Sequence, residues 1–160
     1  MARDELKEVA NEPFIVGRAM LHPGCLLALG VWWLNDDVLK ARYHNWLTGK
    51  LSDLACMVVF PVLVLCVIQL AQSLRGVCWL PSRAQVLVTV VGVGLVFAGI
   101  NLSATVGSAY QAVFARVLQP FLFVFHGIDG LPAIGHTRDP TDLLALPGLL
   151  FAYWLAPRRA

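Results

Sequence analysis

Two short polar segments of this chain place ionisable side chains at the start of an apolar run. Each segment holds two of them: Lys50 and Asp53 in residues 46–55 (WLTGKLSDLA), and Asp139 and Asp142 in residues 139–145 (DPTDLLA). In both segments a Ser or Thr precedes an Asp, and a Leu follows it. A carboxylate at membrane depth is costly unless it is paired. Polar helix starts that meet at one depth are a way to build a buried polar site in a membrane protein.

Cationic and proton-carrying residues occur near both segments. Lys50 lies three residues before Asp53 and can pair with it on one helix face. Histidines nearby could add proton chemistry, because the unperturbed histidine pKa is about 6.5. The candidate polar site therefore consists of Lys50, Asp53, Arg138, Asp139, Asp142, His44, His136 and Asp36.

Helix capping is an alternative explanation of the same residues. Asp139 fits an N-cap, Pro140 fits the first helical position, and Asp142 can oppose the helix dipole. Ser52 and Asp53 stand in a similar relation to the apolar run after them. Capping alone accounts for the Ser/Thr-Asp order, so both interpretations stay open.

Other chemistries have weaker support. A metal site from His44, His136, Asp53 and Asp142 lacks an i, i+4 histidine pair and an H-E-x-x-H motif. Ser52 lacks a nucleophile-elbow motif and an identifiable base. The four cysteines, Cys25, Cys56, Cys66 and Cys78, include no C-x-x-C pair and are predicted to be packing residues. We therefore expect no metal, no cofactor and no disulfide framework.

Composition predicts an all-α integral membrane protein whose main partner is the lipid bilayer. Of 160 residues, 58% are hydrophobic and 14% are charged, with a mean hydropathy of +0.70, whereas soluble domains are roughly 25% charged. A net charge of +2 gives no argument for nucleic acid. Residues 1–13 are polar and of mixed charge, unlike a secretory signal, so we expect a retained N-terminal tail.

The apolar runs predict four membrane spans within a helical domain at residues 14–157. The spans cover about 14–34, 51–72, 84–101 and 139–156. The first reaches sufficient length only by including Arg18, and residues 35–37 (NDD) are expected to end it. Pro61 is expected to kink the second.

Residues 103–126 form a fifth hydrophobic segment whose placement decides the topology. As a span it would put Arg116 near the bilayer centre, which costs about 2.5–3.5 kcal/mol on insertion scales. An interfacial or re-entrant helix broken at Pro120 avoids this cost, and we favour it. Both polar segments then lie on one membrane face. If the segment spans instead, they lie on opposite faces and a joint site is lost.

The distribution of Lys and Arg predicts the orientation. With four spans, slightly more of these residues fall on the side of the two termini. The positive-inside rule then places both termini in the cytoplasm and both polar segments outside. We expect the protein to lie in a bacterial inner membrane.

Three motifs carry a resemblance to known proteins: residues 35–40 (NDDVLK), 46–53 (WLTGKLSD) and 139–147 (DPTDLLALP). With them the chain resembles a group of small uncharacterised bacterial multi-pass membrane proteins. That group is expected to carry His where this chain has Asp37. The chain is more weakly similar to the VanZ-like family of envelope membrane proteins. The resemblance implies a multi-pass membrane architecture and assigns no activity.

Two classes of function follow from the sequence. The first is an envelope-associated structural or interaction component of the membrane, which has no catalytic activity. The alternative is a small intramembrane enzyme or transporter whose polar site is built from the two Ser/Thr-Asp helix starts. Either could act with a second copy of the chain or with another membrane protein.

Overall fold

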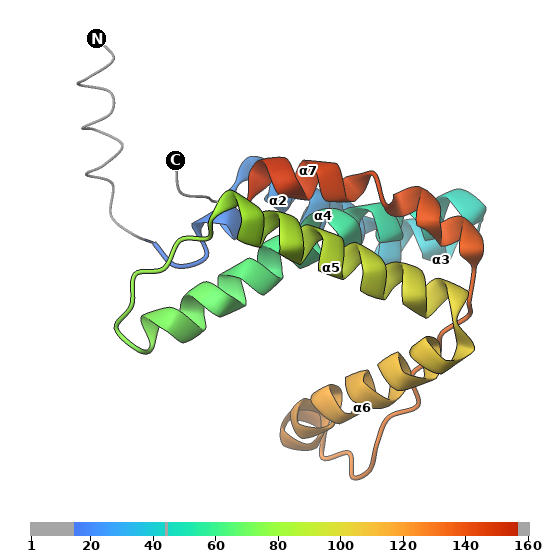
Figure 1. Cartoon of the computed structure of the whole chain (residues 1–160). Coiled ribbons are helices and arrows are strands. Elements are labelled where there is room, and N and C mark those ends of the chain that lie inside the picture. Colours follow the sequence, from blue (N-terminus) through green and yellow to red (C-terminus); the bar gives the residue numbers. More distant parts are fainter. Residues whose placement is uncertain (1–14, 44, 157–160) are drawn as a thin grey trace, which may run out of the picture.

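The computed structural model describes residues 15–43 and 45–156, and its regular elements within these ranges are all helical (Figure 1). The predicted all-helical fold is thereby confirmed. The predicted tail at residues 1–13 and His44 lie outside the described residues. The elements in chain order are η1 (Arg18–Leu21), α2 (Pro23–Leu34), η2 (Asn35–Leu39), α3 (Lys40–Arg42), α4 (Trp46–Ser73), α5 (Arg83–Leu102), α6 (Ala104–His126), η3 (Pro140–Ala145) and α7 (Gly148–Leu155).

Three helices in the described part of the chain are long and apolar enough to cross a membrane: α4, α5 and α6. Helices α4 and α5 coincide with the predicted spans at 51–72 and 84–101. Helix α6 satisfies the same length and composition criteria, although the sequence favoured an interfacial placement. It is also one continuous helix through Pro120, so the predicted break at this proline is wrong.

The first and last predicted spans are built differently from the expectation. Helix α2 starts only at Pro23, with His22 as its N-cap. It does not end at residues 35–37, because a turn of π-helix (η2) carries it on into α3. The last apolar run is a 3-10 helix, η3, followed by the short helix α7.

Helix α4 is the centre of the molecule. Its apolar side packs against α2 and α7, and its second half also packs against α5. The main cluster of buried residues consists of Ala19, Cys25, Val58, Val59, Val62, Cys66, Ala152 and Leu155. All four cysteines are free thiols. Cys25 and Cys66 are buried as packing residues, as predicted, whereas Cys78 is exposed and does not fit that prediction.

Glycines allow α7 to lie directly against its neighbours. A Cβ added at Gly148 would come within 2.8 Å of the Leu54 carbonyl oxygen on α4. A Cβ at Gly94 on α5 would meet Leu149 Cδ1 at 2.7 Å. Small residues at such contacts permit the close helix approach that is typical of membrane bundles.

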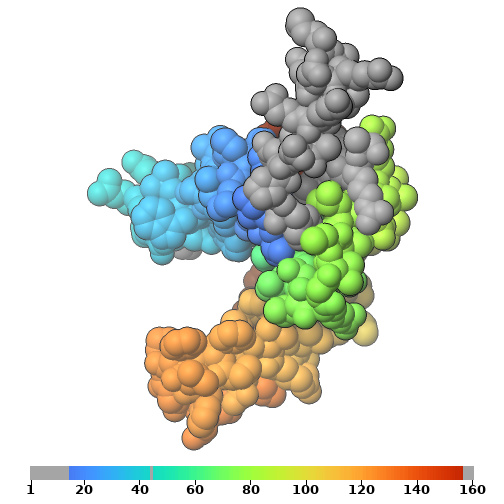
Figure 2. Space-filling model, turned by 90° about the vertical axis from the view of Figure 1, so that its left-hand side faces the viewer, coloured from blue at the N-terminus to red at the C-terminus, as the bar shows by residue number. Residues whose placement is uncertain are grey.

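Helix α6 leads away from the bundle, and the connector that follows it returns to the bundle. Ser103 alone joins α5 to α6, and α6 then diverges from the other helices (Figures 1 and 2). The extended connector, residues 127–139, runs back towards the start of α6. Gln111 Nε2 donates to the Ile134 carbonyl at 2.8 Å, which ties the returning chain to α6. We call α6 with this connector the α6 hairpin.

Substitution Gly148→Ala should lower stability, because its methyl group has no room against the α4 backbone. We expect a loss of about 1–3 kcal/mol, typical of overpacking, measured as reversible unfolding in detergent micelles. Gly30→Ala is the matched control, since nothing lies within 4 Å of a Cβ there. Equal stability of the two variants would show that the α4–α7 contact is not tight.

Candidate functional site

The side chain of Lys50 joins the two polar segments. Its Nζ donates to Asp139 Oδ2 at 2.9 Å and to Asp142 Oδ1, across 89 and 92 residues of sequence. The lysine side chain is 12% exposed and that of Asp142 17%. The Trp46 ring centroid lies 5.8 Å from Nζ, within the range of a cation–π contact. The structure therefore brings the start of α4 and the start of η3 together.

Helix capping explains the Asp139 side chain in the segment at residues 139–145. It does not explain Ser52 and Asp53 in the segment at residues 46–55. Asp139 Oδ1 accepts from Thr141 N at 2.9 Å and from Thr141 Oγ1 at 2.7 Å, so Asp139 caps η3 as predicted. Helix α4 instead begins at Trp46 and is capped by Asn45, whose side chain accepts from Thr48 N. Asp53 lies two turns inside the helix, so the interpretation of Ser52 and Asp53 as caps is wrong.

The surroundings of Asp139 stabilise its ionised carboxylate. It precedes the apolar helical segment and its side chain is 42% exposed. Hydrogen bonds from Lys50 and Thr141 lower the pKa of Asp139 to about 2. The group is therefore an anion at neutral pH, and it leaves Lys50 fully charged between two carboxylates.

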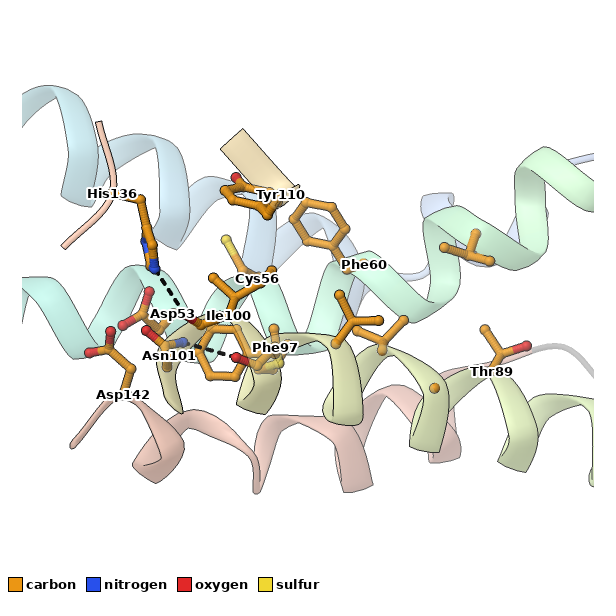
Figure 3. A pocket seen from close by; sticks show the side chains of 15 residues that line it. Asp53, Cys56, Phe60, Thr89, Phe97, Ile100, Asn101, Tyr110, His136 and Asp142 are labelled. Carbon is orange, nitrogen blue, oxygen red and sulfur yellow. Dashed lines mark hydrogen bonds between the residues drawn. The ribbon is translucent and has the colours of Figure 1, made fainter. Parts of the chain in front are cut away.

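Asp53 and Asp142 meet at one end of a cavity of about 570 Å³ between α4, α5 and the α6 hairpin (Figure 3). Both side chains line this end of the cavity. Cys56 lies one turn further along α4 and also lines the cavity. Two like charges at one end of a mostly apolar cavity repel each other, so a proton or a cation bound there would reduce the repulsion.

Asn101, at the end of α5, is the unexpected member of the site. It is 3% exposed, and its Nδ2 donates to the Phe97 carbonyl at 3.1 Å. Its Oδ1 is buried without a hydrogen-bond partner in the described structure. Leaving a buried acceptor unpaired costs about 1–3 kcal/mol. The labelled side chains of Asn101, Asp53 and Asp142 lie together in Figure 3.

The α6 hairpin supplies the remaining polar wall. His136 Nε2 lies 3.2 Å from the Ile100 carbonyl oxygen, and a carbonyl only accepts, so this nitrogen carries a hydrogen. The Tyr110 ring meets the imidazole edge-on, with centroids 6.0 Å apart. Both residues line the cavity. His136 is thus close to the two carboxylates, as the sequence suggested.

Asp36 belongs to a separate network at the junction of α2 and α4. It accepts from Trp32 Nε1 at 2.8 Å and from Ser52 Oγ at 2.6 Å, and it pairs with Lys40 at 2.6 Å. Partial burial raises the pKa of Asp36, but these bonds outweigh burial and hold the pKa below its ordinary value. Asp36 does not line the cavity.

The Ser52 hydroxyl forms its hydrogen bonds at this same junction. Its hydroxyl accepts from Asn35 Nδ2 at 2.6 Å while it donates to Asp36. Asn35 Nδ2 also donates to the Thr48 carbonyl at 2.6 Å. Ser52 therefore joins two helices, and the carboxylate that accepts its hydroxyl hydrogen is itself paired with Lys40.

The remaining candidates do not join the cluster. Arg138 is exposed and, within the described part of the chain, forms no ion pair with Asp53, Asp139 or Asp142. His44 lies outside the described residues. No group of three or more His, Cys, Asp or Glu side chains among residues 15–43 and 45–156 is arranged to hold a metal ion.

No family model, curated protein or solved structure matches the chain. Function must therefore be argued from the geometry of the cavity and its charges. The resemblance carried by the sequence motifs stays a prediction.

Replacing Lys50 by Met should destabilise the protein, because Asp139 and the half-buried Asp142 would lose their shared counterion. We expect a loss of up to about 3 kcal/mol in unfolding free energy, measured by denaturation in micelles. Adding Asp142→Asn to Lys50→Met should restore part of this loss. Lys40→Met, which breaks an exposed pair, should cost less than about 1 kcal/mol. Equal effects at the two lysines would contradict the role given to Lys50.

Proposed function

We propose that this chain is a multi-pass membrane protein that binds a membrane amphiphile in the cavity, with the carboxyl groups of Asp53 and Asp142 facing its head group. One observation carries the proposal: a polar end and a long apolar wall belong to a single cavity. The apolar wall consists of Met57, Phe60, Val64, Gly92, Val93, Val96, Phe97 and Ile100. Such a mixed lining is typical of sites for ligands with an apolar body.

The length of the cavity supports a lipid-like occupant. Asp53 and Val64 are eleven residues apart on α4, which is about 16 Å along a helix at ~1.5 Å per residue. The hydrocarbon core of a bilayer is about 30 Å thick. With Asp53 near one membrane face, the cavity reaches to about the bilayer centre, which is the depth of one lipid leaflet.

The side of the cavity is open, and this gives an apolar tail a path from the bilayer. Phe60 is 41% exposed and Val96 is 59% exposed, although both line the cavity. In a membrane these side chains would contact lipid tails. An amphiphile could therefore reach the site sideways without passing through water.

The proposal includes a topology in which the α6 hairpin stays at one membrane face. Its connector, residues 127–139, leads from the end of α6 back to Lys50 and contains Gly, Pro, Asp and His residues in extended backbone. If α6 crossed the bilayer, this extended backbone would have to cross back, where its polar groups have no partners in lipid. An interfacial or re-entrant α6 avoids that cost and keeps both polar segments on one face, with the termini in the cytoplasm of a bacterium and the protein in the inner membrane.

A purely structural role in the envelope explains less of the site. The ion pairs of Lys50 account for the joining of α4 to η3. They do not require Asp53 to lie beside Asp142, or the Asn101 oxygen to stay unpaired in a cavity. These two features favour the alternative of a small intramembrane transporter or enzyme.

Cysteine labelling in intact cells tests the topology. Cys78, exposed in the connection between α4 and α5, should be protected from an impermeant maleimide until the membrane is permeabilised. Asp129→Cys in a Cys78→Ser background should be labelled without permeabilisation, because the proposed topology keeps the connector after α6 on the outer face. Protection at both positions would show that α6 crosses the membrane.

Cross-linking with a photoactivatable fatty alcohol in bilayer nanodiscs tests the amphiphile site. The probe should label α4 and α5 peptides of the unchanged protein. Gly92→Leu should abolish most of this labelling, because a Cβ at Gly92 has nothing within 4 Å and the side chain would fill the cavity. Val91→Leu, on the exposed neighbouring position outside the cavity, is the control. Labelling that is unchanged by Gly92→Leu would overturn the proposal.

A further inference from the structure

Three donor groups at the polar end of the cavity already make hydrogen bonds. Lys50 Nζ donates to Asp139 and Asp142, His136 Nε2 to the Ile100 carbonyl, and Asn101 Nδ2 to the Phe97 carbonyl. The acceptors are not used to the same extent. Asn101 Oδ1 has no partner in the described structure, and a carboxylate has about four acceptor positions. A ligand that satisfies the Asn101 oxygen must therefore bring a donor.

The charges at the polar end of the cavity also restrict which head groups fit there. Three carboxyl groups, those of Asp53, Asp139 and Asp142, face the one ammonium group of Lys50. A carboxylate or phosphate head group would add like charge to a poorly solvated place, which is unfavourable. A cationic head group would neutralise this excess of negative charge.

We infer that the head group bound in the cavity is a primary amine in its ammonium form, held by Asp53, Asp142 and the free oxygen of Asn101. An ammonium has three N–H donors, one for each of these three side chains. A hydroxyl has one donor and no charge. A quaternary ammonium has the charge and no donor, so it would leave the Asn101 oxygen unpaired. This inference rests on the proposed function.

The apolar wall adds the second requirement of the ligand. The amine must be attached to an alkyl chain that follows α4 and α5 from Asp53 towards Thr89 (Figure 3). A long-chain amine and a membrane lipid with an ethanolamine head group both satisfy this chemistry. The experiment has to separate these two sources.

Displacement of a fluorescent dodecyl probe from the full-length protein in phosphatidylcholine nanodiscs tests the inference. The competitors share one chain: dodecylamine, dodecanol, dodecanoate and dodecyltrimethylammonium, each below its micellar concentration. Dodecylamine should compete at least about tenfold more strongly than the other three, a difference of about 1.4 kcal/mol. Added phosphatidylethanolamine that competes identifies a lipid source, and failure to compete identifies a free amine.

Two substitutions report on the groups that hold the amine. Asp53→Asn should remove most of the preference for amine over alcohol. Asn101→Leu, which keeps the approximate side-chain volume, should weaken the affinity for dodecylamine about fivefold or more. This is the size expected for the loss of about 1 kcal/mol. Asp129→Asn, an exposed carboxylate on the connector, is the matched control and should leave all affinities unchanged. Thermal unfolding without competitor identifies any variant that fails to fold, and the other variant then decides.

The outcomes separate the two proposals. Equal competition by all four head groups, or a preference for dodecanoate, overturns the amine and leaves amphiphile binding intact. Equal competition by dodecylamine and dodecyltrimethylammonium overturns the role of Asn101. If the fluorescent probe itself does not bind, the proposed amphiphile site falls, and the amine inference falls with it.

Discussion

The ammonium group of Lys50, held between Asp139 and Asp142, is the contact on which the arrangement of this molecule depends. It fixes the start of η3 against the start of α4, and α7 follows η3 along α4 from there. This contact places the Asp142 carboxyl group near Asp53. It also ties Asp139, the last residue of the connector, to α4 and so closes the α6 hairpin against the bundle. An ion pair in a poorly solvated place is costly to break, since the partners that remain are left uncompensated.

Part of the site could be predicted from the sequence, because the chemistry lies in two recognisable segments. Their similar order of Ser or Thr, Asp and Leu indicated that they could meet, and Lys50 was an expected partner. Which carboxylates Lys50 contacts could not be predicted from the sequence. Helical spacing permits a pair between Lys50 and Asp53, three residues on, whereas the lysine reaches Asp139 and Asp142 of the other segment. Local spacing describes one helix, and it does not contain the distances that tertiary packing sets.

Asn101 and the junction at Asn35 were not predicted, for the same reason. A single Asn at the end of an apolar run gives no sign of whether its oxygen meets a donor. Residues 35–37 were expected to end a membrane helix, because carboxylates do not belong in hydrocarbon. They continue it because Ser52 and the Thr48 carbonyl at the start of α4 accept from the Asn35 side-chain amide, and Ser52, Trp32 and Lys40 pair with Asp36. Rules for helix ends apply to isolated segments, and here the neighbouring helix provides the partners.

The α6 hairpin gives the cavity its histidine and tyrosine while burying very little of itself, since only Gly107 and Ala115 of α6 are buried. Segments with few buried contacts open at a small fraction of the global unfolding free energy. The wall that carries His136 and Tyr110 can thus separate from the bundle while α2, α4, α5 and α7 stay assembled. A molecule bound at the proposed site would then leave through this local opening, at a rate largely independent of how stable the bundle is.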